Sequence, residues 1–281
     1  MRRLDMPKIN FKSHYEKCVE GKQEPVRSNL LGCISFLVGK NKKYRAYAKN
    51  SSLYRLQKTD PSHIAPAKKN QLKQLYEERM AREGAPGKKI YDRIMTAARA
   101  CPYCGHGTLF TLDHYLPKGI SHFPELSIAP LNLIPACRDC NSNKHVHVPT
   151  REEEQYIHPY FEDVDGHNWL AASTHYSTVD ELTVTYAVSD TLTDPVLKSR
   201  IKKQFKDLKL NYIYSAQAAT ELVPTYTLLK QRHEDGGVPN VVEYLREQER
   251  FRSELSKNDW RAVFYRALLA DSRVHAMRWK L

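Results

Sequence analysis

Two closely spaced pairs of cysteines constrain this chain more than any other feature of its sequence. Cys101/Cys104 and Cys137/Cys140 each have C-x-x-C spacing, and 32 residues separate the two pairs. Each pair can form a tight turn that presents two thiolates to one ion, and two such turns complete the tetrahedral shell of a structural zinc. Disulfides are the alternative, but we find no apolar signal-peptide core and therefore expect a reducing environment. Because four thiolates fill the shell of this zinc, a catalytic metal would need a second site.

Positive charge is concentrated in the first hundred residues. The net charge of the chain is +12, and residues 1–100 contain 23 lysines and arginines against 9 acidic residues, whereas the remainder contains 21 against 23. This asymmetry indicates a polyanionic partner, most simply nucleic acid, with a solvated basic surface as the alternative. The longest apolar run, Leu30–Val38, is too short to span a bilayer, so we expect a cytoplasmic protein without a membrane partner.

The chain divides by pattern into three predicted regions. Residues 1–88 form a basic, partly helical region, and residues 89–148 are irregular and rich in Cys, His and Asn. Residues 149–281 predict a strand pair followed by helices. The expected fold class is therefore α+β, mostly helical, with a small zinc-stapled module in the middle of the chain.

Local patterns place several elements outside the module. Basic and aromatic residues are interleaved over Lys40–Tyr47, as in surfaces that bind phosphates and stack bases, although an exposed basic loop fits equally well. Apolar residues recur at helical spacing over Ala67–Arg82, and they alternate as in a strand over Leu182–Val188. Asp194-Pro195 is a favourable helix start. Further helices are predicted at Ile90–Ala98, near Val242–Leu255 and near Trp260–Leu268.

A second motif lies between and around the cysteine pairs. Asp113-His114 follows the first pair, Asn132 precedes the second, and the second pair continues as C-N-x-x-K with Asn141 and Lys144. In this order the residues resemble the HNH, or ββα-metal, nuclease superfamily. The resemblance implies a ββα module, for which we predict strands at Thr108–Leu112 and Leu133–Ala136 and a helix that starts near Cys140.

The resemblance also assigns roles to these residues. Hydrolysis of a phosphodiester needs an activated water and neutralised charge at the phosphate, and His114 is the candidate general base. Asp113 and Asn141 match the ligand positions for Mg²⁺ or Mn²⁺, and Asn132 matches the Asn that fixes the backbone around the histidine. Lys144 matches a basic position near the phosphate. Whether His145, four residues after Asn141, is a third ligand stays open.

Flanking segments resemble a narrower group of proteins. These are the HNH nucleases of bacterial anti-phage systems of the Septu type, some of them linked to retrons, in which the nuclease is paired with an ABC or SMC-like ATPase. The resemblance predicts a defence effector with an ATPase partner. It is carried by Lys89–Asp92, Cys101–Gly105, Leu112–Lys118, Phe123–Leu126 and His158–Phe161.

Two hypotheses without cleavage compete with the nuclease: a zinc-stapled module that binds nucleic acid, and a subunit that docks to a partner. No base-reading motif is visible, so the sequence leaves DNA and RNA open as substrates.

Overall fold

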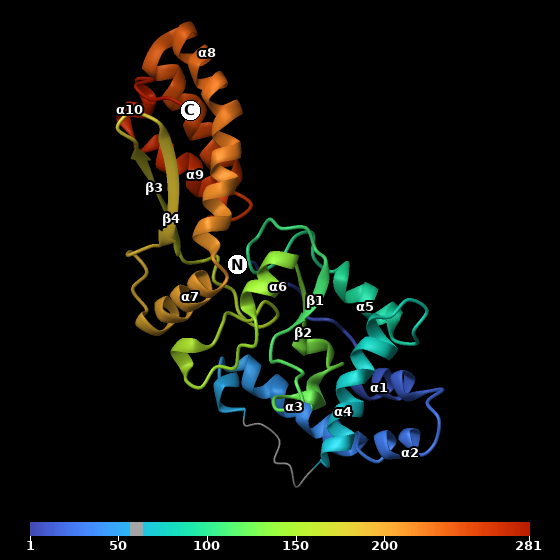
Figure 1. Cartoon of the computed structure of the whole chain (residues 1–281). Helices are drawn as coiled ribbons and strands as arrows, with labels where there is room; N and C mark the ends of the chain where they lie inside the picture. Colours follow the sequence, from blue (N-terminus) through green and yellow to red (C-terminus); the bar gives the residue numbers. More distant parts are fainter. Residues whose placement is uncertain (57–63) are drawn as a thin grey trace. The chain divides into compact units, whose positions relative to one another are not determined.

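The computed structural model describes residues 1–56 and 64–281. Over these residues the chain forms two compact units, one over residues 2–163 and the other over residues 164–281 together with Met1. The predicted basic region and the predicted cysteine-rich module thus lie within the same unit (Figure 1). Residues 57–63, which belong to the predicted basic region, are outside the described part.

Helices occupy most of the first hundred residues of the first unit. The predicted helix over Ala67–Arg82 corresponds to α4 and the π-helical turn Tyr76–Ala81 that continues it. Lys40–Tyr47 lies within α3, and its Tyr44 is fully buried, so this tyrosine cannot stack on a base. The helices are α1 (Phe11–Val19), α2 (Val26–Leu31), α3 (Ile34–Lys49), α4 (Pro66–Leu75) and α5 (Lys88–Met95).

The middle of the chain has the ββα order expected from the resemblance. Strand β1 (Thr111–His114) pairs antiparallel with β2 (Leu133–Ala136), with His114 opposite Leu133, and α6 (Arg138–Lys144) follows. Strand β2 has its predicted bounds, whereas β1 begins three residues later than predicted. The turn of the first cysteine pair, in which Gly105 has a φ of +79°, covers residues 102–107, and residues 108–110 lead from it into the strand. Helix α6 begins at Arg138 rather than near Cys140, because Cys137 is its N-cap.

Tyrosines from outside this module hydrogen-bond to its two strands. Tyr76 donates to the carbonyl of Leu112 on β1 at 3.0 Å, and Tyr160 donates to that of Leu133 on β2 at 2.7 Å. A sheet of two strands leaves backbone groups unpaired along its outer edges, and these hydroxyls satisfy two of them. The segment before α5 and the segment after α6 therefore both stabilise the sheet.

A buried histidine joins α3 to the same part of the unit. His158 is fully buried, and its Nε2 lies 2.9 Å from the hydroxyl of Tyr44 on α3. Its ring stacks on that of Tyr115, with centroids 4.3 Å apart. Of the run His158–Phe161, which we identified through the resemblance, residues 158–160 are buried and Phe161 is half-buried.

The second unit is built on a hairpin and a set of helices. Strands β3 (Leu170–Tyr176) and β4 (Leu182–Val188) pair antiparallel, and β4 has its predicted bounds. Asp194 caps α7 (Pro195–Asp207) by accepting from the amides of Val196 and Leu197, as its sequence predicts. The remaining helices are α8 (Leu210–Ser253), α9 (Trp260–Leu269) and α10 (Ser272–His275).

Helix α8 changes direction at two glycines. Gly236 and Gly237 leave helical geometry, and Gly237 has a φ of +68°, which residues with a Cβ rarely adopt. Its two parts, over residues 210–235 and 238–253, therefore form separate helices (Figure 1). Trp260 and Trp279 are each only 3% exposed and belong to the core of this unit.

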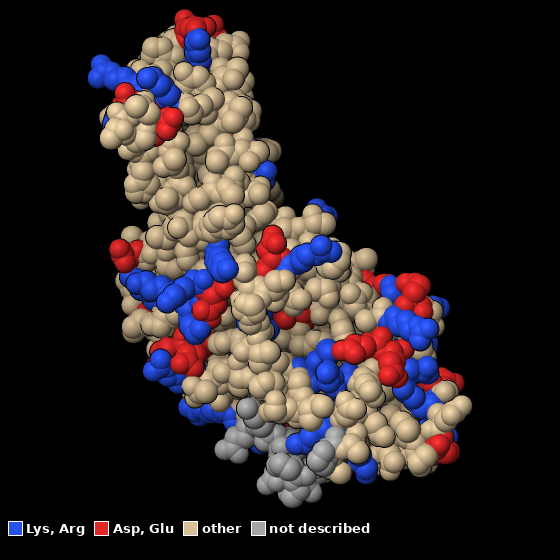
Figure 2. Space-filling model, viewed as in Figure 1, with Lys and Arg blue, Asp and Glu red and all other residues tan. Residues whose placement is uncertain are grey.

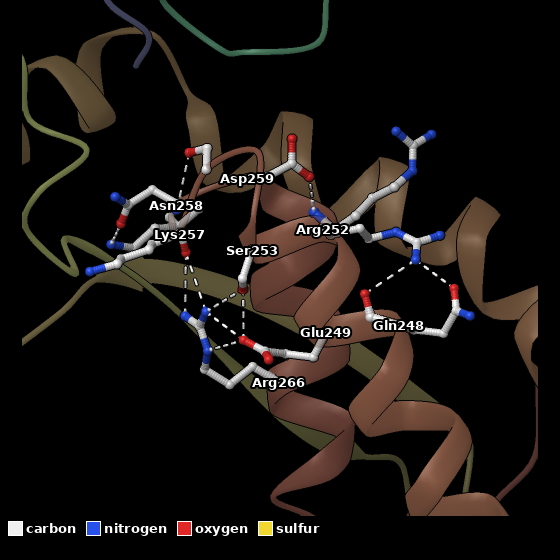
Figure 3. Close-up of polar contacts among 11 residues, drawn as sticks. Gln248, Glu249, Arg252, Ser253, Lys257, Asn258, Asp259 and Arg266 are labelled. Atoms are coloured by element: carbon white, nitrogen blue, oxygen red, sulfur yellow. Dashed lines mark hydrogen bonds and ion pairs between the residues drawn. The ribbon is translucent and has the colours of Figure 1, made fainter.

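A cluster around Arg266 ties the end of α8 to α9 (Figure 3). The Arg266 guanidinium donates to the Glu249 carboxylate at 2.8 Å and to the Ser253 hydroxyl at 3.1 Å, both on α8. It also donates to the carbonyl of Lys257 at 3.4 Å. Since these groups use several of its donors, Arg266 serves to hold the two helices together.

In neither unit is any described helix of sufficient length and hydropathy to span a bilayer.

Candidate active site

The four cysteines of the two C-x-x-C pairs converge in the first unit. All four are buried, and their sulfur atoms lie within 4.8 Å of one another. Tetrahedral zinc with Zn–S bonds of about 2.3 Å requires sulfurs about 3.8 Å apart, and Cys104 Sγ lies 3.9 Å from Cys137 Sγ. All four are free thiols, so the disulfide alternative is not what the structure has. The geometry fits the predicted zinc.

The backbone around the sulfurs also fits a metal-binding turn. The amide of Gly107 donates to Cys104 Sγ at 3.3 Å, and the amide of Cys140 donates to Cys137 Sγ at 3.4 Å. A Cβ at Gly107 would lie 2.8 Å from Cys137 Sγ and 2.7 Å from Cys137 Cβ. Only glycine allows the chain to pass this close to the sulfurs.

His114, at the end of β1, has one ring nitrogen held and the other available. Its Nε2 lies 2.7 Å from the carbonyl oxygen of Ser127. Because a carbonyl only accepts, Nε2 carries the proton and Nδ1 keeps its lone pair. None of the described residues is recorded as a hydrogen-bond partner of Nδ1. Burial lowers the pKa of His114 to about 3, so the ring is neutral near pH 7. A neutral imidazole fixed in this way is able to accept a proton.

Asn132 fixes the loop that follows β1. Its side chain accepts from the amide of Leu116 at 2.8 Å and donates to the carbonyl of the same residue at 2.9 Å. A longer contact of 3.3 Å reaches the carbonyl of Leu126, one residue before Ser127. Asn132 is fully buried, so replacing it would leave these backbone groups without a partner. Its contacts hold both segments that position the His114 ring.

Asp113 is buried beside His114 and makes two charged contacts. Tyr103, between the first two cysteines, donates from its hydroxyl to Asp113 Oδ2 at 2.8 Å. Lys144 Nζ lies 3.1 Å from the same oxygen and 3.2 Å from Oδ1, and donates to the carbonyl of His114 at 2.7 Å. Burial raises the pKa of Tyr103 well above its usual value, which keeps its hydroxyl protonated as a donor.

Lys144 is therefore an internal residue in this structure. Its side chain is 1% exposed, and its ammonium is bonded within β1. The sequence predicts a basic group near the phosphate at this position. The structure places that group against Asp113, where it balances a buried carboxylate.

The predicted metal ligands lie on two adjacent elements. Asp113 belongs to β1 and Asn141 to α6, and these elements pack on each other. A carboxylate and an amide oxygen are ligands that Mg²⁺ accepts, so the donor types fit a divalent cation. His145 follows the last residue of α6 with a φ of +48°. The helix has ended there, so helical periodicity does not place His145 on the face of Asn141.

The family comparison matches residues 101–147 to HNH endonucleases. This segment is an HNH endonuclease domain. It contains both cysteine pairs and all the residues for which we predicted catalytic roles.

A phage protein is also similar to the chain. Protein ea31 of Escherichia phage lambda is 32% identical over 171 residues, which cover 58% of this chain and 57% of that protein. The chain thus spans little more than half the length of this relative. No solved structure matches the chain.

Three residues around the HNH domain's histidine were not identified from the sequence. Tyr103 lies inside the C-P-Y-C turn, where its neighbours were identified only as zinc ligands. Ser127 acts through its backbone carbonyl, which no side-chain pattern reveals. Tyr76, whose ring meets that of His114 edge-on with centroids 4.5 Å apart, comes from a helix outside the domain, and its sequence offers no signal for this contact.

Proposed function

We propose that this chain is a metal-dependent endonuclease that hydrolyses phosphodiester bonds in nucleic acid. The observation that carries the proposal is the geometry of His114, whose Nε2 is held by the Ser127 carbonyl and whose Nδ1 lone pair is left available, next to Asp113 in the chain. A second group that fixes the tautomer and orientation of a histidine leaves the other ring nitrogen free to take a proton.

His114 Nδ1 takes a proton from the attacking water, whose oxygen forms a bond to phosphorus as the bond to the leaving oxygen breaks. Asp113 and Asn141 would hold the divalent cation, which supplies charge neutralisation at the scissile phosphate when bound. Tyr103 and Lys144 orient the Asp113 carboxylate, and Asn132 keeps the His114 ring in place. The four-cysteine zinc holds the loop that contains these groups together.

Exposed cations on α3 and in the segment before α1 form a candidate surface for substrate binding in the same unit. Lys8, Lys42 and Arg45 are exposed and line a hollow of about 620 Å³ together with Pro130 and Leu131, the residues that precede Asn132. Exposed cations of this kind bind phosphates without regard to sequence.

Cleavage of labelled single- and double-stranded DNA and of RNA, with Mg²⁺ or Mn²⁺ and after EDTA treatment, tests the proposal. Replacing His114 by Ala should lower the rate about 10²- to 10⁴-fold, as removal of a general base does. Nucleic-acid affinity and zinc content should stay close to those of the parent, and thermal unfolding should show only a stability loss of about 1–3 kcal/mol for the lost bond to the Ser127 carbonyl. Cleavage by the variant at the parent's rate would refute the role of His114.

One observation favours a second candidate, a zinc-stapled module that binds nucleic acid or docks to a partner without cutting. The Lys144 ammonium pairs with Asp113, the carboxylate that the nuclease needs for its metal. In that case no divalent cation would support cleavage of any substrate, and binding would be insensitive to Asp113→Asn.

We further propose that the nuclease acts in the cytoplasm as an effector of anti-phage defence and is controlled by an ATPase subunit of the ABC or SMC-like kind. This rests on the sequence resemblance of the segments that flank the HNH domain. A nuclease with a basic surface needs restraint in its host, because phosphate contacts are largely sequence-independent. Co-purification of the tagged chain with an ATPase encoded beside its gene is the test, and full cleavage without any such partner would contradict it.

A further inference from the structure

A second group of cations lies in the other compact unit, around α7 and the start of α8. Between positions 198 and 209 the chain has six basic residues and a single acidic one, Asp207. The basic residues of this segment are Lys198, Arg200, Lys202, Lys203, Lys206 and Lys209. In Figure 2 blue Lys and Arg side chains gather in the region where Figure 1 labels α7, with acidic side chains beside them. Charge of this density is unusual in a unit that is otherwise nearly balanced.

Three of these six cations are paired with an acidic side chain or buried within the unit. Lys198 pairs with Asp190 at 3.1 Å, Lys203 pairs with Asp207, and Arg200 is buried. The other three, Lys202, Lys206 and Lys209, are exposed, and no ion pair is recorded for them among the described residues. Lys202 and Lys206 are one helical turn apart on α7, so they share a face, and Lys209 is the N-cap of α8.

The three lysines line one hollow of about 610 Å³, together with Phe205, Asn211 and Tyr212. Asp190 also lines the hollow, and its carboxylate pairs with Lys198. Tyr212 is 76% exposed, whereas tyrosine is a residue of intermediate burial in folded proteins. We refer to Lys202, Lys206, Lys209 and Tyr212 as the α7 patch. It combines unpaired cations with an uncovered aromatic ring, in contrast to the Arg266 cluster, where the cation is held by acceptors of its own unit.

We propose that the α7 patch binds a single-stranded segment of nucleic acid, as a contact separate from the HNH domain. The proposal rests on the proposed function, which makes nucleic acid the polyanion that this protein meets. Phosphates pair with the three lysines, and a base stacks on Tyr212. A single strand is specified because the bases of a duplex are stacked on each other and do not present a face to an aromatic side chain.

Binding is best measured by fluorescence anisotropy on the full chain with His114 replaced by Ala, so that cleavage does not interfere. The probes are a labelled oligothymidylate strand and a labelled duplex. The patch variant replaces Lys202, Lys206 and Lys209 by Gln. A matched control replaces Lys230, Arg246 and Arg250, three exposed cations of α8 in the same unit, by Gln.

For the single strand, the patch variant should bind more weakly than the control. The slope of log affinity against log salt should also fall by about 2, since each lost phosphate contact removes about 0.7. Tyr212→Ala should weaken single-strand binding about 5- to 100-fold, as loss of one base stack does, and leave duplex binding nearly unchanged. Equal losses in the patch variant and the control would overturn the proposal, as would a patch variant that binds like the parent.

The same proteins with His114 intact separate this proposal from the nuclease. If binding depends on the α7 patch and no cleavage occurs, the result supports the patch proposal and refutes the nuclease proposal. If cleavage occurs and binding does not depend on the patch, the result refutes the patch proposal alone. Zinc content and thermal unfolding of each variant confirm that it is folded, and the Lys202→Gln/Lys206→Gln double variant replaces the triple variant if Lys209→Gln disturbs the start of α8.

Discussion

The hydroxyl of Tyr103 donates a hydrogen bond of 2.8 Å to Asp113 Oδ2. Tyr103 lies between two of the cysteines that fit a zinc ion, and Asp113 is the carboxylate next to the proposed general base. The position of the carboxylate therefore depends on the zinc turn. A zinc ion held by these cysteines would thus be connected to the proposed site through Tyr103, and also through Lys144 on the helix that contains Cys140.

Replacing Tyr103 by Phe should weaken Mn²⁺ binding and lower kcat, because Asp113 loses a donor that orients it. The stability loss should be about 1–3 kcal/mol, the cost of a buried hydrogen bond to a charged group. Tyr160→Phe is the matched control, because it removes a buried hydroxyl that bonds to the β2 carbonyl of Leu133 and not to Asp113. A change in metal affinity in both variants, measured by calorimetric titration, would show that the effect is one of stability alone.

Replacing Cys101 or Cys137 by Ser should release the zinc and destabilise the HNH domain broadly, because metal binding at such sites is coupled to folding. Elemental analysis should find one zinc per parent chain and much less in these variants. Cys33→Ser is the control, since Cys33 is buried away from the cluster. Full zinc content in the Cys101 variant would contradict the four-cysteine site.

Lys144→Met should destabilise the first unit by about 3–5 kcal/mol, because it leaves the buried Asp113 carboxylate without its cation. Mn²⁺ should restore more stability to this variant than to the parent, since the ion supplies the missing positive charge. Lys118→Met removes a more exposed ion pair with Glu77 and should cost well under that amount. Thermal unfolding with and without Mn²⁺ measures the stability loss and the stabilisation by the ion. If Mn²⁺ stabilises the parent and the Lys144 variant equally, the result would count against a metal at Asp113.

The stability of the first unit should fall as pH drops from about 6.5 to about 4, in part because of His14. Burial lowers the pKa of His14 from 6.5 to about 4, so within this window the unfolded chain binds a proton that the folded chain does not. As the pH falls below the pKa that His14 has in the unfolded chain, the free energy of unfolding therefore decreases. Denaturant unfolding of His14→Leu should show a shallower pH slope, by up to about 1.4 kcal/mol per pH unit. An unchanged slope would assign the pH dependence to other groups.

Much of the HNH domain was predictable because its chemistry fixes residue types at fixed spacing. Two C-x-x-C pairs bring four sulfur atoms together, and the order of Asp113, His114 and Asn132 follows from the ββα module. Regular patterns such as Leu182–Val188 were also readable, because alternation has a direct structural meaning.

Other features depended on contacts that the sequence does not display. Basic and aromatic residues alternate over Lys40–Tyr47, yet Tyr44 is turned into the core toward His158, since α3 buries one face. Likewise, the basic character of Lys144 does not reveal that its ammonium is enclosed beside Asp113. Tertiary packing decides both cases, and a linear pattern carries no information about it.

The tyrosine hydroxyls at the edges of the small sheet determine how far the first unit can be shortened. Tyr76 and Tyr160 lie on either side of the segment 101–147, and their partners are carbonyls of β1 and β2. A fragment cut to that segment would expose both edges and uncover the ring of His114, which Tyr76 meets edge-on. The smallest fragment that should fold on its own therefore lies near residues 2–163, and an excised 101–147 peptide is expected to aggregate through its open strands.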